Sequence, residues 1–443
     1  MKKYVWGLAA IAIMVIGFAV PSQAASFKVG DTDWTLGGSA RLDVGWRSQD
    51  LGEARTEFGI GALDKQKDFF LTVPTNTRIF AKAVNGNLTG YTELGLSPGN
   101  AAWDIAAEVK VRHVYLGYDM GGGNSLLLGH SWTCVAEDSP NQRLFDDNGL
   151  MGVGDLYLGR RPQIRFIHTQ DKMTFQVAIE DNRATILTDE FIDTLWEFTG
   201  ENLDIDHPCY LIEDVTPAIA LSLSYAGDSF VITPSLYAQQ FTLKADEVEE
   251  NEDGDYVALE GLDDVKVTSY VLALDAALKF EGLTLSGEAW WGQNVALIGY
   301  ITNAGNPVFG YPVPDLESGY FDNDDTATND FDITDVKSYG AWLQLAAPLK
   351  PGTLYVGAGY QKAESGIDID EVSIDDYTAM GFFINYEYPI AKNFTMTPEV
   401  AYLDYGKFKG SVVELVETEE VTTDWDLKLG KDWFFGVHFQ YDF

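Results

Sequence analysis

Two arginines and a glutamine alternate along a short stretch whose chemistry suits anion binding. Arg161, Gln163 and Arg165 occupy every second position, and Ile164 and Phe166 lie between them. Side chains of a strand alternate between its two faces, so the polar set shares one face and the apolar set shares the other. Guanidinium groups stay charged and grip carboxylates in a fork. The polar face could therefore select small carboxylates.

A long segment that carries carboxylates precedes this stretch. It runs from about residue 133 to 159, and its charged residues are Glu137, Asp138, Arg143, Asp146, Asp147 and Asp155. A soluble core could not bury unpaired arginines without a large cost in free energy. A membrane barrel avoids that cost, because its apolar face meets lipid and its polar face meets a wet lumen. We predict that the segment folds into the lumen, faces Arg161 and Arg165 and narrows a pore. Anchoring of the segment by ion pairs is a compatible reading.

Residues 1–24 have the features of an export signal that is cleaved. Two lysines precede an apolar run from Leu8 to Val20, and cleavage after Ala24 would leave small residues at positions −3 and −1. The run is short for a membrane span, and no later segment holds the ~18 uninterrupted apolar residues of a membrane helix. We expect residues 25–443 to form a single transmembrane barrel domain.

Period-two alternation continues along the rest of the chain. Trp34 and Trp46 bound one apolar face, and the chain ends on alternating aromatic residues that finish at Phe443. We count about sixteen strands, and every second connection between them is tight. The remaining connections are long and acidic, at residues 181–216, 244–264, 292–336, 362–376 and 406–426. Short periplasmic turns and long outer loops are typical of bacterial outer-membrane barrels. The predicted fold is therefore all-β, an antiparallel transmembrane barrel with an inward-folded third loop.

The arginines are unevenly placed. All ten lie between Arg41 and Arg183, and the rest of the chain uses only lysine as a base. Chance and ordinary surface charge are one explanation, and a one-sided cationic wall is the other. In the second case Arg41 and Arg78 extend the wall, with Arg112 as a further candidate. The phase around Arg112 stays open, because either Lys110 and Arg112 or the alternate pair His113 and Tyr115 face the lumen.

Three features resemble bacterial outer-membrane porins: the terminal phenylalanine, the long loop after the fifth strand, and a set of short motifs. The motifs are Val111-Arg112-His113-Val114-Tyr115, Leu128-Gly129-His130-Ser131-Trp132-Thr133 and Arg161-Pro162-Gln163-Ile164-Arg165-Phe166. In this order they resemble the DcaP-type porins. The resemblance implies a homotrimer that passes small dicarboxylates and related anions. This chain lacks the amino-terminal coiled coil that such proteins can carry, and its loops are more acidic.

Cys134 and Cys209 are the only cysteines. Both fall on outer loops in the predicted topology, where the compartment is oxidising, so a disulfide that pins the constriction loop is plausible. Two unpaired thiols are the alternative.

The net charge is −39 at pH 7, and the aspartate and glutamate residues are concentrated in the long loops. Acidic loops are ordinarily solvated, and the alternative is bridging to lipopolysaccharide or ordering of the loops by calcium. The run Asp322-Asn323-Asp324-Asp325 lacks the glycine and the distal glutamate of an EF-hand. We expect no other cofactor, and we expect membrane lipid rather than nucleic acid as a partner.

The leading functional hypothesis is a non-enzymatic porin for passive diffusion of small hydrophilic solutes. It would favour small carboxylate anions through an arginine-lined constriction. A barrel that is a sleeve for a partner, such as an electron carrier, is the second class. An outer-membrane lipid hydrolase is the third, but the five histidines are scattered singly and no Gly-x-Ser-x-Gly motif is present.

Overall fold

The structure is a computed structural model. It describes residues 24–50, 65–97, 108–144, 152–182, 209–213, 216–250, 256–259, 265–299, 313–314, 333–364, 368–369, 372–374, 376–416 and 419–443. Across these ranges, no helix combines the length and the apolar character needed to cross a membrane. The proposed signal peptide lies outside them.

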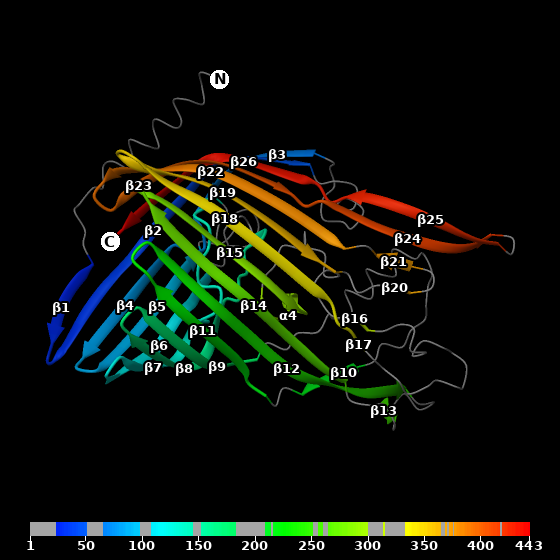
Figure 1. Cartoon of the computed structure of the whole chain (residues 1–443), viewed down its shortest axis with the longest axis horizontal. Helices are drawn as coiled ribbons and strands as arrows, with labels where there is room; N and C mark the ends of the chain where they lie inside the picture. Colours follow the sequence, from blue (N-terminus) through cyan, green and yellow to red (C-terminus); the bar gives the residue numbers. More distant parts are fainter. Residues whose placement is uncertain are drawn as a thin grey trace, which may run out of the picture.

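The described strands close into an antiparallel barrel with sixteen positions, as predicted (Figure 1). Around the barrel the strands are β2 (Thr32–Asp50), β4 (Arg78–Asn85), β5 (Leu88–Ser97), β6 (Glu108–Gly121), β7 (Asn124–Trp132), β8 (Arg160–Gln170), β9 (Met173–Glu180), β11 (Ala218–Ala226), β12 (Phe230–Glu250), β14 (Val265–Phe280), β15 (Leu283–Gln293), β18 (Lys337–Leu349), β19 (Gly352–Ala363), β22 (Tyr377–Ala391), β23 (Phe394–Asp404) and β26 (Lys431–Asp442). β26 pairs with β2, from Asp442 opposite Ser39 to Lys431 opposite Asp50, and this pairing closes the ring. Closure leaves the barrel wall without an exposed edge.

Two positions of the barrel are shared by two strands each. β3 (Lys65–Thr72) pairs with the second half of β2, and β4 pairs with its first half. β10 (Cys209–Glu213) continues the position of β11 beside β12. β1 (Ala25–Val29) adds a short hairpin to the start of β2. The tight turns gather at one end of the barrel, where β26 also ends (Figure 1).

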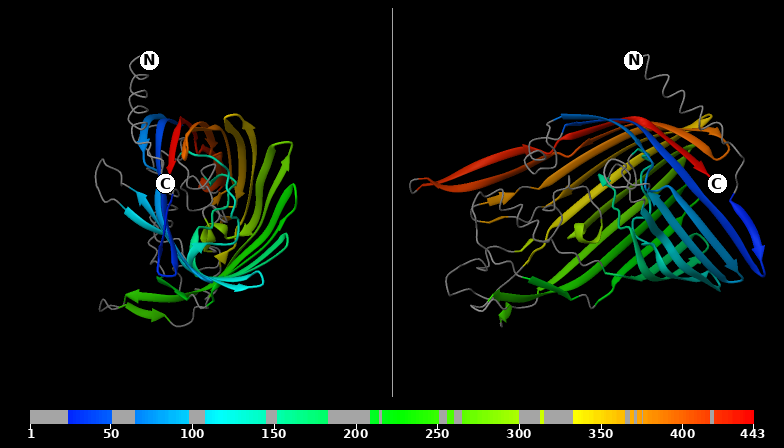
Figure 2. Two further views of the ribbon diagram at one scale, coloured as in Figure 1. Left: turned by 90° about the vertical axis from the view of Figure 1, so that its left-hand side faces the viewer. Right: turned by 180° about the vertical axis from the view of Figure 1, so that it is seen from behind.

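Parts of the long acidic connections continue as β-structure, which the sequence interpretation had treated as loop. β12 runs on to Glu250 and pairs there with β13 (Tyr256–Leu259). The remaining described pieces are β16 (Val313–Pro314), β17 (Ile333–Thr334), β20 (Asp368–Ile369), β21 (Val372–Ile374), β24 (Lys407–Val416) and β25 (Glu419–Lys428). β24 and β25 form a hairpin that projects beyond the barrel, because antiparallel pairing continues where both strands extend (Figure 2).

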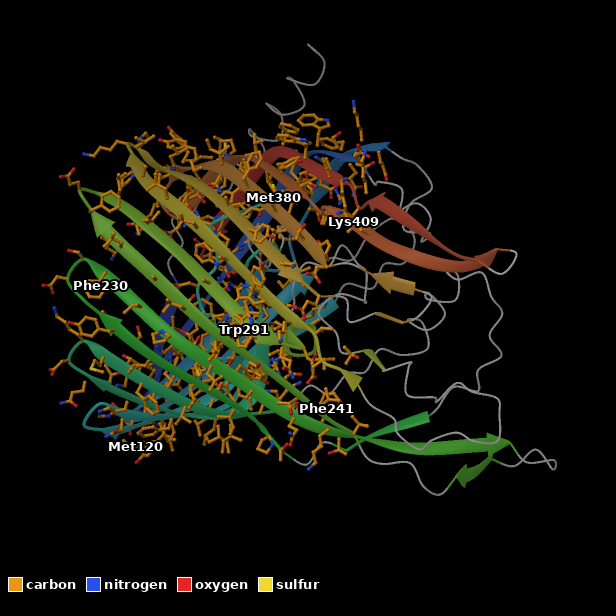
Figure 3. All side chains as sticks on the ribbon, turned by 45° about the vertical axis from the view of Figure 1, so that its right-hand side comes forward. Met120, Phe230, Phe241, Trp291, Met380 and Lys409 are labelled. Atoms are coloured by element: carbon orange, nitrogen blue, oxygen red, sulfur yellow. The ribbon has the colours of Figure 1, made fainter. Side chains whose placement is uncertain are left out.

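The barrel wall is apolar outside and polar inside, which is the reverse of a soluble sheet packed on a core. In β18 every second residue from Ser338 to Gln344 is buried, and the residues between them are exposed. Phe230, Trp291 and Met380 are large apolar residues with more than 40 % of their surface exposed, and they lie along the wall in Figure 3. Such an apolar belt on the outer face matches a lipid environment.

One side of the lumen is filled by an apolar core. Loop residues Leu144, Val153, Leu156 and Leu158 pack there with Trp290, Trp342, Phe383 and Phe434 of the wall and with the short helix α4 (Val295–Ile298). Full burial of one leucine contributes about 1.5–3 kcal/mol to stability. This core holds the segment between β7 and β8 inside the barrel.

Candidate constriction site

We call the segment between β7 and β8 the constriction loop (residues 133–159). Its described residues, 133–144 and 152–159, run inside the lumen along β15 to β23. Seen along the barrel in Figure 2 (left), it lies within the ring of strands. Glu399 of β23 accepts hydrogen bonds from the backbone nitrogens of Arg143 (2.7 Å) and Leu144 (3.0 Å). Glu288 of β15 accepts one from the backbone nitrogen of Leu156 (3.0 Å). Carboxylates of the wall thus satisfy loop N–H groups, and the loop is held to one side of the lumen.

Three further strands of the same side hold the loop. Gln344 of β18 accepts a hydrogen bond from Asn141, whose carbonyl accepts one from Asn385 of β22. Gly154 donates to Gln361 of β19, and its carbonyl accepts a hydrogen bond from Trp290 Nε1. The loop therefore leaves β2 to β6, on the other side of the ring, uncovered by these contacts.

Arg161 is buried on the inner side of β8, where it anchors the loop. It has no exposed surface, and its guanidinium donates to the carbonyl oxygens of Leu158 and Ile298 and to the hydroxyl of Tyr237. Its Cζ also lies 4.6 Å from the centroid of the Tyr237 ring. These contacts tie the loop end to β12 and α4, so Arg161 contributes to anchoring the loop.

Arg165 and Gln163 also turn inward, and they form one network with the start of the loop. Arg165 donates to Gln163 (2.8 Å), to Gln176 (3.0 Å) and to the carbonyl of Trp132, and it lies 3.5 Å from Glu137. The expected pairing of an acidic loop with the arginines is present at this contact. Arg165 keeps little exposed surface, with 7 % of its side chain accessible.

A β-bulge resolves the phase around Arg112. Glu93 of β5 is opposite His113, whereas the next residue, Leu94, is opposite Val111, so Arg112 is the extra residue. An extra residue in one strand re-aims the side chains around it. Both alternatives of the sequence interpretation are therefore partly right, because Arg112 and His113 each contact residues of the lumen face.

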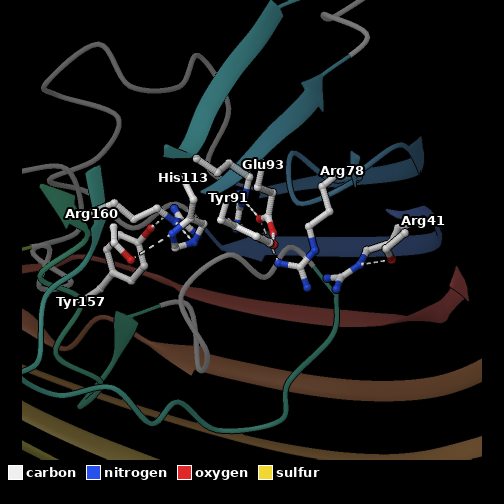
Figure 4. Close-up of polar contacts among 10 residues, drawn as sticks. Arg41, Arg78, Tyr91, Glu93, His113, Tyr157 and Arg160 are labelled. Carbon is white, nitrogen blue, oxygen red and sulfur yellow. Dashed lines mark hydrogen bonds and ion pairs between the residues drawn. The ribbon is translucent and has the colours of Figure 1, made fainter. Parts of the chain in front are cut away.

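Glu93 sits at the centre of a cluster of charged groups from three adjacent strands. Its Oε1 accepts hydrogen bonds from Arg112 Nε (3.0 Å) and Arg78 Nη1 (3.2 Å), and its Oε2 accepts one from the Tyr91 hydroxyl (2.8 Å). Glu93 is buried, whereas 35 % of the Arg78 side chain stays exposed. Arg41 lies beside this group in Figure 4 and donates to Ser39 (3.1 Å). The arginines of β2, β4 and β6 thus lie side by side.

Arg160 joins the same row, although sequence reasoning did not select it. Its Nε lies 3.2 Å from His113 Nε2, and its guanidinium stacks over the Trp132 ring at 3.7 Å from the centroid. It also donates to the Tyr157 hydroxyl (3.3 Å; Figure 4). Strict alternation from Arg161 assigns Arg160 to the lipid face, and only the strand end lets the side chain reach inward. Its partners His113, Trp132 and Tyr157 lie far apart in the sequence, so they could not be read from spacing.

The other residues selected from the sequence are dispersed. Arg143 lies 3.0 Å from Glu387 on the far wall. Asp155 is fully buried and interacts electrostatically with Glu288 of β15. Burial raises the pKa of Glu137 and of Asp138 above the usual range, although Arg165 opposes the shift at Glu137. Asp146 and Asp147 lie outside the described residues.

No group of three or more His, Cys, Asp or Glu side chains within the described ranges is arranged to hold a metal ion. The calcium hypothesis concerned the long acidic loops, and most of their residues lie outside those ranges. Cys134 is buried and unbonded.

A closed barrel with a loop anchored inside its lumen is the architecture of outer-membrane porins. No family model and no curated protein matches the sequence. Solved structures do match. The outer membrane channel DcaP of Acinetobacter baumannii is similar over 95 % of this chain and 100 % of its own, with a TM-score of 0.56 and 14 % identity. The anion-selective porin from Comamonas acidovorans is similar over 93 % of this chain and 100 % of its own, with a TM-score of 0.54 and 13 % identity.

Salmonella typhi OmpF is a third similar structure, over 95 % of this chain and 100 % of its own, with a TM-score of 0.51 and 12 % identity. The chain therefore has the porin fold, a closed barrel of sixteen strand positions within its described residues. The resemblance to porins, including a DcaP-type structure, is confirmed at the level of the fold.

Proposed function

We propose that this protein is a porin of the bacterial outer membrane that passes small hydrophilic solutes by diffusion and favours small carboxylates. The observation that carries the proposal is the position of the constriction loop. Its described contacts hold it against β15 to β23, while Arg41, Arg78 and Arg112 lie on β2, β4 and β6 and are only partly buried. Rows of fixed charge in a narrow passage select ions, and low-dielectric walls strengthen their field.

The arginine wall differs from the one that we predicted. Arg161 and Arg165 support the loop and have little surface left for a solute. The candidate solute-facing residues are Arg41, Arg78 and Arg112, with Arg160 at the end of the row. Arg78 and Arg112 share the carboxylate of Glu93, so this pair keeps an excess of positive charge.

A reversal-potential measurement in a KCl gradient tests the proposal. We expect a preference for chloride in the wild-type protein and a lower preference in Arg78→Gln, because a guanidinium is lost from the wall. Lys172→Gln is the matched control, since Lys172 is an exposed base at the tight turn between β8 and β9. An unchanged permeability ratio in Arg78→Gln would refute the arginine wall. Liposome swelling with a panel of acids and sugars then ranks the solutes.

The trimer, the lipopolysaccharide contacts and the signal peptide are parts of the same proposal. The trimer rests on the sequence resemblance, the lipopolysaccharide contacts rest on the acidic loops, and the signal peptide rests on the pattern of residues 1–24. Openings in steps of three in planar bilayers, together with a trimer band in unheated gels, are the expected signs of three barrels. A single conductance step would contradict a trimer.

The two alternative classes are less well supported. A barrel that encloses a partner needs an open lumen, with the constriction loop outside it. Here the described part of the loop is anchored inside the lumen. A hydrolase would need a serine next to a histidine that can accept its proton, and Ser131 Oγ lies 3.2 Å from His113 Nδ1. Arg160 Nε can only donate, so His113 Nε2 accepts and its Nδ1 carries the proton. That ring nitrogen cannot take a proton from Ser131.

A further inference from the structure

We propose that Glu93 is a resident carboxylate that sets how strongly the arginine wall holds a passing anion. This inference rests on the proposed function and assigns a specificity-determining role within it. Two guanidiniums converge on one oxygen of Glu93, from Arg112 at 3.0 Å and from Arg78 at 3.2 Å. Two convergent guanidiniums form a strong site for a carboxylate, and here the chain itself supplies the carboxylate.

A β-bulge and a tyrosine hydroxyl fix the position of Glu93. The bulge adds Arg112 opposite Glu93, and a regular ladder would have placed a single residue there. The Tyr91 hydroxyl holds the second carboxylate oxygen at 2.8 Å. Only 4 % of the Glu93 surface is exposed, so its position is fixed and a solute cannot displace it sideways into water.

The consequence for transport is a balance between attraction and release. Conduction requires a site that attracts the solute but also lets it leave. Glu93 accepts a hydrogen bond from one nitrogen of Arg112 and from one nitrogen of Arg78, and it cancels one of their two charges. Passing anions therefore meet the exposed part of Arg78 and the field of the row, without a vacant two-arginine clamp.

The test is Glu93→Gln in planar bilayers, with malonate as the carboxylate probe. The amide keeps an oxygen that can accept a hydrogen bond, but it removes the charge. We expect the chloride-to-potassium permeability ratio to rise about fourfold, because losing one negative charge about 10 Å from the ions in water favours chloride about twofold and disfavours potassium about twofold. Malonate should block the chloride current at a concentration about fivefold lower than in the wild type, because the charge that neutralises one of the two guanidiniums is gone and the pair attracts a carboxylate more strongly.

Glu281→Gln is the control, because it makes the same substitution at an exposed turn between β14 and β15, far along the chain from the cluster. It should leave the permeability ratio and the malonate block unchanged. If Glu93→Gln changes neither the permeability ratio nor the block, the inference is overturned. A wild-type channel without anion preference would contradict the proposed function instead, and the comparison of Glu93→Gln with the wild type would still measure the charge of Glu93.

A second pair of variants keeps the test valid if Glu93→Gln does not fold. Arg112→Gln alone should lower the permeability ratio for chloride, because Glu93 then has one guanidinium fewer. Arg112→Gln combined with Glu93→Gln removes opposite charges, and its ratio should return close to that of the wild type. Equal ratios in the single and the double variant would show that ions do not sense Glu93, which overturns the inference.

Discussion

The Oε1 atom of Glu399 lies 3.0 Å from the backbone nitrogen of Leu144, so a carboxylate of the barrel wall holds the constriction loop. Glu399→Ala leaves two N–H groups of the loop without their acceptor. Each lost partner costs about 1–3 kcal/mol, and we expect a lower unfolding temperature and a larger single-channel conductance. Glu399→Gln keeps one acceptor oxygen, so its unfolding temperature and its conductance should lie between those of the wild type and those of Glu399→Ala. A conductance equal to the wild type in Glu399→Ala would show that other contacts suffice to hold the loop.

Arg161 should matter for stability more than for selectivity. Arg161→Gln removes donors from the carbonyls of Leu158 and Ile298, and each unsatisfied buried carbonyl costs about 1–3 kcal/mol. Urea unfolding followed by tryptophan fluorescence measures that loss. The reversal potential should change less than in Arg78→Gln, because Arg161 has no exposed surface. A larger change in selectivity for Arg161→Gln than for Arg78→Gln would place Arg161 in the ion path.

Asp275 and Glu288 are cross-strand neighbours, and both side chains are buried in the barrel. Two carboxyl groups in a medium of low dielectric constant repel each other when both are ionised. In Asp275→Asn the amide can donate a hydrogen bond to Glu288, so we expect the unfolding temperature to rise at neutral pH. A loss of stability at neutral pH would mean that Asp275 has a partner which needs its charge.

Gly154 lets the loop approach the wall closely. Its φ is +78°, and a Cβ there would lie 2.3 Å from the Ala341 carbonyl oxygen and 2.8 Å from the Tyr360 backbone nitrogen. Gly154→Ala should therefore displace the loop, lower the unfolding temperature and increase the variance of the open-channel current. Gly90→Ala is the control, because a Cβ at Gly90 meets nothing within 4 Å. Equal behaviour of the two variants would contradict close packing at Gly154.

The two cysteines are expected to stay unpaired. Cys134 contacts Ser222, which is opposite Ser235 on β12, whereas Cys209 is opposite Asp246 of the same strand. At about 3.3 Å per residue these positions on β12 are roughly 36 Å apart, far beyond the reach of a disulfide. Reduced and non-reduced samples should therefore migrate equally in gels. Faster migration of the non-reduced chain would support the disulfide that pins the loop.

Alternation along the strands determined the barrel from the sequence. A strand exposes every second side chain to each face, so Trp34 to Trp46 and the aromatic end of the chain were enough to predict an apolar outer wall. The same rule placed Arg161 and Arg165 inside, and the spacing of strands and turns located the constriction loop. These features are local, and each depends only on residues close in the chain.

Only the tertiary structure decided which arginines meet the lumen. Arg161 is covered because Tyr237 and Ile298, from distant parts of the chain, close over it. Arg112 points inward because of a bulge, which is a matter of register between two strands and leaves no periodic trace in the sequence. Pairing, loop contacts and burial involve residues far apart in the chain, so the order of the residues alone does not specify them.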